Sequence, residues 1–391
     1  MKICFLNSFF SPDNRGGAEM IVNSLAVFLT RQGHDVVVIC TALDGHHVSE
    51  TVTAEGAEII VHRLASHNIA PYGQIGSVAP ILKPLWHIRD MFNGTQAREV
   101  TALVSALAPD LIWTHNLKGL SYTVLRHLKA TKIPIYSHIH DIQFAVPSGL
   151  LNLEKVDSFN LVHFVYRQII KTVLPQTGVQ WIFPSRWLLA FYQTYGLFKH
   201  DVQVSPNPLP TINLAPSLKV ANRRVNVYYA GQLEEHKGLS DLLTVASENW
   251  FEQKADLFIA GEGSRRALVT KLANRCGHIS YLGLLPLARL VNELRNNADL
   301  VIVPSRCLEN QPTIISLALA LKIPVLASAS GGIPEMIGET NGLLFKPGSV
   351  DDLRRQLQIT LSMDLTAYKK NIVCPNPTSD EYLAKLFKTL P

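Results

Sequence analysis

Two stretches in the second half of the chain place charged side chains and glycines where an anionic ligand could bind. The first contains Gly231, Gln232 and Lys237, and it follows an expected strand at 226–230. A lysine on a loop that leaves such a strand is positioned to neutralise a phosphate group. A lysine in a generic turn would carry no such meaning, so the indication depends on the Gly-Gln-Leu sequence ahead of it.

The second stretch follows an expected strand at 300–303 and combines Glu309 with Pro312. Proline suits the first turn of a helix, where its missing N–H costs nothing. The free N–H groups of residues 313–315 would then form an anion site. Glu309 is favourable beside such a site if it accepts hydrogen bonds from sugar hydroxyls. The alternative is an acid that only complements the helix dipole.

The first half of the chain offers a glycine pair and a histidine at the ends of expected strands. Gly16 and Gly17 precede a helix, so backbone N–H groups can approach an anion there. His140, beside Asp141, follows an expected strand at 133–137 and would face a ligand cleft. The alternatives are an ordinary strand-to-helix turn and a structural histidine.

Short apolar runs alternate with longer helical patterns through most of the chain. Continuous Val, Ile and Leu runs are typical of strands buried on both faces, and their alternation with helices predicts parallel βαβ units. The expected strands are 2–9, 35–40, 58–62, 111–114, 133–137, 180–183, 202–204, 226–230, 256–259, 279–282, 300–303, 324–327 and 343–345.

The strand pattern restarts near Asn226, after a proline-rich and weakly periodic stretch. We therefore expect an α/β protein with two Rossmann-like domains. The first would cover 1–205 and the second 225–376, joined by a linker at 206–224 and followed by a C-terminal helix at 377–391. Ligands bind such sheets at the carboxyl ends of the strands, so two domains facing each other would form one cleft.

Composition limits the classes of protein to which the chain can belong. It has 391 residues, 47% apolar and 17% charged, so a large core is feasible and general disorder is excluded. This length suits two domains better than one. The net charge is +5 without a Lys/Arg tract, which argues against nucleic-acid binding and suits an anionic ligand or membrane surface.

Cysteine usage indicates the compartment. The five cysteines are widely spaced and contain no Cys-x-x-Cys, which argues against a disulfide framework or structural zinc and for a reducing environment. The N-terminus lacks a signal-peptide cleavage site, and no apolar run reaches about 20 residues. We expect a cytoplasmic protein.

Taken in order, these residues resemble the family-4 retaining glycosyltransferases of the GT-B fold, across nearly the whole chain. Each motif is weak alone, but their order is specific. In the second half the matching motifs lie at 231–238, 259–264, 281–283, 298–305, 309–325, 331–335 and 341–344. In the first half the looser matches lie at 16–19, 140–141, 183–185 and 207–208.

The resemblance implies transfer of a sugar from a nucleotide-sugar donor, with the anomeric configuration retained and without a metal or other cofactor. Lys237 would stabilise the leaving diphosphate, Glu309 would bind hydroxyls of the donor sugar, and His140 would contact that sugar from the first domain, which also binds the acceptor. Positive groups lower the barrier where leaving-group charge develops. The implied donor-binding positions are Gly16, Gly17, Gly231, Gln232, Gly283, Asn310, Gln311, Thr313, Ile314 and Leu317.

Two positions depart from the family pattern. Gln232 replaces an arginine, and Leu317 replaces a second glutamate that usually binds ribose hydroxyls. A lost hydrogen bond to a charged group costs about 1.5–3 kcal/mol. Ribose recognition would then pass to a polar neighbour, with Ser316 and Gln311 nearest. The alternative is that Leu317 turns into the core.

The acceptor expected from the resemblance is a glycan or lipid-linked molecule in surface polysaccharide or glycolipid assembly. Segments 78–92 and 161–171 mix apolar and basic residues at helical spacing, which suits peripheral contact with the inner face of a membrane or ordinary helices packed on a sheet. Two other functions remain open: a non-catalytic GT-B partner or binding subunit, and a nucleotide-sugar epimerase. A dinucleotide oxidoreductase is disfavoured because Gly-x-Gly-x-x-Gly is missing.

Overall fold

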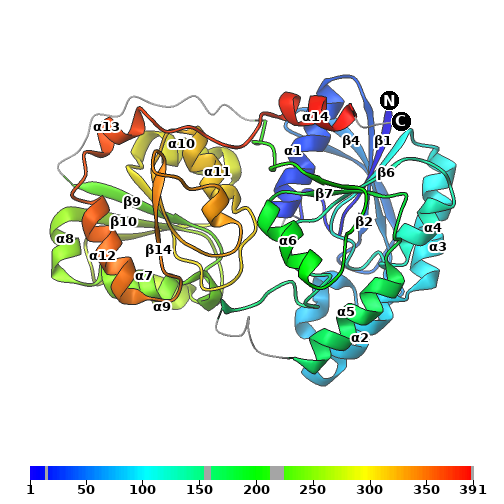
Figure 1. Cartoon of the computed structure of the whole chain (residues 1–391), viewed down its shortest axis with the longest axis horizontal. Helices are drawn as coiled ribbons and strands as arrows, with labels where there is room; N and C mark the ends of the chain where they lie inside the picture. The colour runs from blue at the N-terminus through cyan, green and yellow to red at the C-terminus, as the bar shows by residue number, and fades with distance from the viewer. Residues whose placement is uncertain (14–15, 154–159, 212–223, 389–391) are drawn as a thin grey trace. The chain divides into compact units, whose positions relative to one another are not determined.

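The computed structural model describes residues 1–13, 16–153, 160–211 and 224–388, which form two compact units (Figure 1). Unit 1 contains the described residues of Met1–Gly149, Phe159–Thr211 and Pro377–Pro391, and unit 2 those of Leu150–Ser158 and Ile212–Asn376. Most of the expected linker at 206–224 lies outside the described residues. The two parallel-sheet units confirm the predicted α/β class.

Unit 1 is built on an eight-stranded sheet with the order β3-β4-β2-β1-β5-β6-β7-β8. The strands are β1 (Lys2–Leu6), β2 (Asp35–Thr41), β3 (Val48–Ala54), β4 (Ala57–Leu64), β5 (Leu111–Thr114), β6 (Ile135–His138), β7 (Gln180–Phe183) and β8 (Val202–Val204). All pairs are parallel except β3 with β4. The order reverses between β1 and β5, and ligands bind parallel sheets at such a switch point.

Helices surround this sheet, and two short 3-10 turns precede the second helix (Figure 1). The helices are α1 (Gly17–Arg31), α2 (Lys83–Met91), α3 (Gly94–Leu107), α4 (Val124–Lys129), α5 (Leu161–Val173), α6 (Arg186–Thr194) and α14 (Ser379–Phe387), and the turns are η1 (Tyr72–Ser77) and η2 (Pro80–Leu82). The C-terminal helix α14 belongs to unit 1, where the Tyr136 hydroxyl donates to the Leu386 carbonyl at 3.0 Å.

Unit 2 contains a six-stranded, fully parallel sheet with the order β11-β10-β9-β12-β13-β14. The strands are β9 (Val225–Ala230), β10 (Ala255–Ala260), β11 (Ile279–Gly283), β12 (Leu300–Val303), β13 (Val325–Ser328) and β14 (Gly342–Phe345). The helices are α7 (Leu239–Ala246), α8 (Asn249–Lys254), α9 (Arg266–Ala273), α10 (Leu287–Asn297), α11 (Thr313–Ala320), α12 (Val350–Thr360) and α13 (Leu365–Lys369), with 3-10 turns η4 (Glu235–Lys237) and η5 (Ile333–Glu335). The strand order reverses between β9 and β12.

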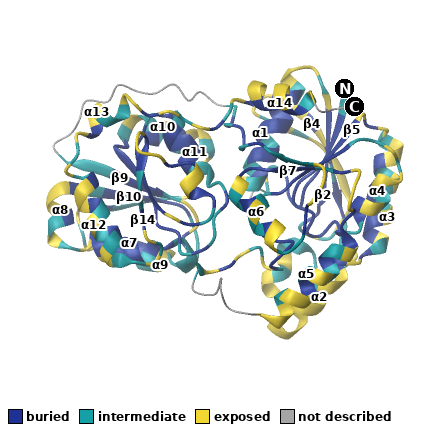
Figure 2. Ribbon diagram, viewed as in Figure 1, coloured by how far each residue is buried: buried dark blue, intermediate teal, exposed yellow. Residues whose placement is uncertain are grey.

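Unit 2 has a core on each face of its sheet. Along β12, Leu300 and Ile302 belong to one buried cluster and Val301 and Val303 to the other, because side chains alternate between the faces of a strand. Both faces are covered, as the continuous apolar runs predicted, and Figure 2 shows the strands as buried. Among the described helices, none is both long and apolar enough to span a membrane.

Two features of the structure differ from the expected layout. The prediction lacked β3, a largely exposed edge strand that pairs with β4 through a turn in which Glu55 and Gly56 both have positive φ. Residues 150–153, expected in the first domain, group with unit 2. There Leu153 N–H donates to the Arg306 carbonyl at 3.1 Å, and Leu308 N–H donates to the Leu151 carbonyl at 3.0 Å.

Candidate active site

Lys237 and Glu309 meet at the switch point of the unit 2 sheet. Lys237 ends η4 after β9, and Glu309 lies on the loop after β12. Lys237 Nζ donates to Glu309 Oε1 at 2.7 Å, and the Ser305 hydroxyl donates to the same oxygen, also at 2.7 Å. The two residues that the sequence singled out for catalysis in this half are therefore in direct contact.

The loop after β9 is fixed to the loop after β12. Gly238 has φ +71°, and a Cβ there would lie 1.7 Å from the Pro304 carbonyl oxygen, so only glycine allows this approach. Arg306 N–H donates to the His236 carbonyl at 2.9 Å. The Arg306 guanidinium donates to both carboxylate oxygens of Asp241, at 2.7 and 2.6 Å. Sequence reasoning missed Arg306 and Asp241, because no motif or spacing links them.

The Gly-Gly-Ile-Pro-Glu motif at 331–335 supports Glu309 from the other side. Gly331 has φ +60°, and a Cβ there would lie 1.9 Å from the Glu309 carbonyl oxygen. Gly332 N–H donates to that oxygen at 2.8 Å. This motif therefore holds the backbone that carries the carboxylate.

The ion pair sets the electrostatics of this part of the site. Burial disfavours the Lys237 ammonium, but the Glu309 carboxylate outweighs it and raises the pKa of Lys237 above its ordinary value. Burial and the same carboxylate raise the pKa of Cys307 to about 12, so its thiol stays neutral. An incoming anion would compete with Glu309 for the ammonium, which would free the carboxylate to accept hydrogen bonds.

The other predicted donor-binding residues of unit 2 lie at strand and helix ends. Gly231 and Gln232 are exposed just after β9, and Gly283 ends β11, where its carbonyl accepts from Gly261 N–H at 2.8 Å. Asn310 is buried and Gln311 half-buried before α11. These positions share the carboxyl edge of one sheet.

The start of α11 corrects one expectation. The helix begins at Thr313 with Pro312 as its N-cap, and no side chain caps it. The Ile315 N–H, expected to be free, donates to the Pro312 carbonyl at 3.0 Å. Thr313 and Ile314 remain the candidates for backbone contact with an anion.

Leu317 lies in the apolar core. Its exposed fraction is 1%, and it belongs to the buried cluster on one face of the unit 2 sheet. Because the Leu317 side chain is buried in this cluster, it does not present a group to a ribose. Ser316 is also buried, which leaves Gln311 as the nearer polar substitute.

In unit 1, Gly16 and Gly17 open helix α1, and both are exposed. Glu19, in the first turn, is buried, and its carboxylate lies 3.4 Å from where a Gly16 Cβ would be. The Glu19 carboxylate therefore already offsets part of the positive end of the helix dipole. A phosphate bound there would lie close to this negative charge.

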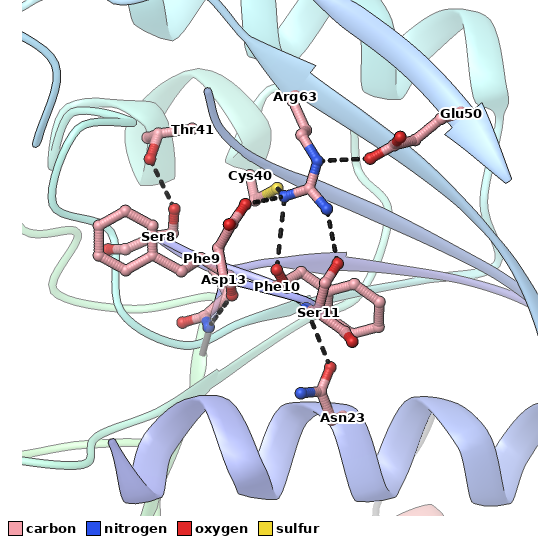
Figure 3. A network of polar contacts seen from close by, with 11 residues as sticks. Ser8, Phe9, Phe10, Ser11, Asp13, Asn23, Cys40, Thr41, Glu50 and Arg63 are labelled. Atoms are coloured by element: carbon pink, nitrogen blue, oxygen red, sulfur yellow. Dashed lines mark hydrogen bonds and ion pairs between the residues drawn. The ribbon is translucent and has the colours of Figure 1, made fainter. Parts of the chain in front are cut away.

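Arg63 of β4 holds the loop that leads to this glycine pair (Figure 3). Its guanidinium donates to the Phe10 carbonyl at 3.4 Å, to the Ser11 carbonyl at 2.5 Å and to Asp13 Oδ2 at 3.0 Å. It also donates to Glu50 Oε1 at 2.6 Å. Sequence reasoning missed Arg63, whose role depends on sheet register.

His140 belongs to a cluster of three histidines at the ends of β5 and β6. His115 Nδ1 and His140 Nε2 lie 2.8 Å apart, so one donates and the other accepts. His138 Nδ1 lies 3.2 Å from the Tyr382 hydroxyl of α14. Burial lowers the pKa of all three, that of His140 to about 3, so the cluster is neutral at physiological pH.

The ring arrangement decides what this cluster can hold. Ring nitrogens of His115, His138 and His140 lie within 4.8 Å of one another, close enough to consider a metal ion. However, the His138 and His140 rings stack at 4.4 Å with an interplanar angle of 16°. A metal must lie in the plane of each ligating ring at about 2.0–2.1 Å, and stacked rings direct their lone pairs side by side. As arranged, the cluster is a hydrogen-bonding group.

Two family models match the chain, and several known proteins are similar to it. Residues 15–211 match the family model "Glycosyltransferase Family 4", and residues 213–372 match "Glycosyl transferases group 1". The chain is 24% identical over 390 residues to an uncharacterized 42.6 kDa protein in the cps region of Klebsiella pneumoniae, covering 99% of this chain and 100% of that one. It is 28% identical over 209 residues to the lipopolysaccharide 1,2-N-acetylglucosaminetransferase of Salmonella typhimurium, covering 48% and 55% of the two chains. The structure of Anabaena HepE in complex with UDP matches with a TM-score of 0.65 and 18% identity over 100% of both chains, a likeness of fold.

Proposed function

Because the chain belongs to the group 1 glycosyltransferase family and has its GT-B fold, we propose that it moves a sugar from a nucleotide-sugar donor to a glycan or lipid-linked acceptor. The observation that carries this proposal is the contact between Lys237 and Glu309 at the switch point of unit 2. It supplies a cation for a diphosphate and a carboxylate for sugar hydroxyls on two loops that are fixed to each other.

We assign the reaction to retaining, metal-independent transfer. The bond from the anomeric carbon to the diphosphate breaks, the acceptor oxygen bonds to that carbon, and the acceptor proton leaves with the diphosphate. Lys237 and the N–H groups of Thr313 and Ile314 stabilise the departing charge, which is the role a metal would otherwise fill. Glu309 orients the donor sugar. Within unit 1, the neutral His140 is a hydrogen-bonding group paired with His115.

The relatives support a place in surface-glycan assembly. One is in a cps region, and another is by its name a lipopolysaccharide N-acetylglucosaminetransferase. HepE was solved with UDP, so UDP-sugars are the first donors to test. A lipid-linked acceptor would bring the protein into peripheral contact with the inner face of a membrane.

A non-catalytic binding subunit is the second candidate. It is favoured by Leu317, whose core position removes the ribose contact of the family pattern. The Lys237–Glu309 pair argues against it, because Ser305, Gly238 and Gly331 all hold that pair in place.

Calorimetric titration with a panel of UDP-sugars, followed by detection of released UDP with and without acceptor, tests the proposal. We expect one donor to bind and UDP to be released faster when acceptor is present. Binding without turnover would favour the binding subunit, and turnover that converts the donor without acceptor would favour an epimerase. No binding by any nucleotide sugar would contradict the proposal.

A further inference from the structure

Exposed apolar side chains gather on two segments of unit 1, which we call the α2–α5 surface. Of the 17 exposed large apolar side chains among the described residues, nine lie on η2, α2 with the residue after it, and the first turns of α5. Their exposed fractions range from 42% to 85%. They are Ile81, Leu82, Leu85, Ile88, Phe92, Leu161, Val162, Phe164 and Val165. Figure 2 shows both helices with exposed residues on their outer sides.

The inner faces of these helices are already accounted for by packing. Trp86 and Asp90 are the buried side of α2, and Tyr166 and Ile170 are the buried side of α5. The Tyr166 hydroxyl donates to the Gln143 carbonyl at 2.8 Å. Burial raises the pKa of Tyr166, and the Asp90 carboxylate raises it further. The buried sides of α2 and α5 therefore lie near each other, around Asp90 and Tyr166.

The outer faces repeat apolar residues at helical spacing. On α5, Leu161, Phe164 and Val165 stand at i, i+3 and i+4, which places them on one side of the helix. On α2, Leu85 and Ile88 stand at i and i+3. Packing against the sheet explains the inner faces but not these rows.

Basic residues flank the apolar rows, and exposed acids are missing from both helices. The cations are Lys83 and Arg89 on α2 and Arg167 and Lys171 on α5. None of the four takes part in an ion pair that joins two described residues. The one acid in the two helices, Asp90, is 3% exposed. Among the described residues, the surface therefore offers positive charge without a carboxylate partner beside apolar area, and the Arg167 guanidinium packs over the Tyr195 ring at 4.1 Å.

We propose that the α2–α5 surface docks the protein on a bilayer that contains anionic lipids. Helices that lie in a membrane interface combine an apolar face with flanking Lys and Arg, and binding grows with buried apolar area and with attraction to anionic headgroups. No described helix is suited to span the bilayer, so the contact is interfacial. The inference rests on the proposed function for its purpose, access to a lipid-linked acceptor, but it uses none of the residues assigned to donor binding.

Flotation of the full chain with lipid vesicles, without substrate, tests the docking. One vesicle is an equal mixture of phosphatidylglycerol and phosphatidylcholine, and the other is phosphatidylcholine alone. We expect at least about tenfold stronger binding to the mixed vesicles, weakened by added salt because exposed charges are screened. A wild-type protein that stays off the mixed vesicles, or binds both vesicles equally, would overturn the proposal.

Substitutions on α2 and α5 test whether the α2–α5 surface is the part of the protein that binds the vesicles. Leu85→Gln with Ile88→Gln removes exposed apolar area, and we expect about tenfold weaker flotation. Arg89→Gln and Lys171→Gln should each weaken binding to the mixed vesicles about fivefold, the equivalent of about 1 kcal/mol per cation. The matched control is Ile359→Gln on α12 of unit 2, where the side chain is 43% exposed.

Urea unfolding midpoints check that each variant is folded. Variants that fold normally and still bind like the wild type would show that the α2–α5 surface is not the docking site. Because the docking variants change none of the residues assigned to donor binding, loss of docking with intact donor binding would leave the proposed function standing. Vesicle binding by a protein that binds no nucleotide sugar would leave the docking proposal standing and contradict the proposed function.

Discussion

At the level of single residues, the chemistry assigned to unit 2 depends on one partly buried ion pair whose two members have different roles. Lys237 and Glu309 hold each other at 2.7 Å, and Ser305 orders the carboxylate. A charge that is already in place when the reaction begins needs no reorganisation, which is why such groups lower barriers efficiently.

Replacing Glu309 separates its two possible tasks. Glu309→Gln keeps the size but removes the charge, and we expect donor transfer to fall about 10²-fold or more because the sugar hydroxyls lose a charged acceptor. Steady-state assays measure this, with Glu339→Gln, an exposed glutamate of the same unit, as control. Unchanged transfer would show that Glu309 does not bind the donor sugar and only pairs with Lys237 and Ser305.

Arg63 offers a stability prediction in unit 1. Arg63→Met would leave the Asp13 and Glu50 carboxylates and two loop carbonyls without their donor, so we expect unfolding free energy to fall by about 1–3 kcal/mol. Arg31→Met removes a surface ion pair at 3.8 Å and should cost less than about 1 kcal/mol. Equal losses in urea unfolding would contradict the role assigned to Arg63.

Asp90 gives a pH dependence with a defined sign. Burial outweighs the Gly119 hydrogen bond and the Lys118 ammonium and raises the pKa of Asp90 from 3.8 to about 7. The folded state therefore binds a proton that the unfolded state has released, and stability from this group is full below about pH 4 and is lost as the pH rises to about 7. We expect the stability advantage of the wild type over Asp90→Asn to shrink across this window in urea titrations. Parallel curves for the two proteins would refute the assignment.

At the level of secondary-structure elements, the buried strands were predicted from the sequence and an exposed edge strand was missed. Continuous apolar runs such as β5 and β12 were predicted because interior parallel strands need them. The strand β3 was missed because its residues are largely exposed and polar, as an edge allows. Within the candidate site, the motifs around Lys237 and Glu309 were predicted, whereas Arg63 was not, because its partners come from distant segments.

A substitution in helix α11 tests whether Leu317 is a core residue. Leu317→Glu would bury a carboxylate among apolar side chains, so we expect a loss of several kcal/mol in unfolding free energy and no gain in donor affinity. Gln311→Glu, at the half-buried loop before the helix, is the matched control and should be tolerated. A stable Leu317→Glu variant with tighter donor binding would mean that position 317 faces the nucleotide.

At the level of the whole molecule, the mostly parallel sheet of unit 1 and the parallel sheet of unit 2 each reverse their strand order once. Candidate residues follow the strands at each reversal. In unit 2 these are Lys237 and Glu309, and in unit 1 the glycine pair at 16–17 and His115. The rule that ligands bind at such points connects the fold to the site without reference to any single motif.

The most direct test of the central claim is the transfer rate of Lys237→Ala, measured with the donor that the binding panel identifies. We expect kcat/KM to fall about 10²–10³-fold, because a preorganised charge that meets the leaving diphosphate is worth about 2.7–4 kcal/mol. Lys271→Ala, an exposed lysine on α9 of the same unit, should retain wild-type activity. A folded Lys237→Ala protein with near-normal turnover would contradict the assignment of this lysine to the donor diphosphate.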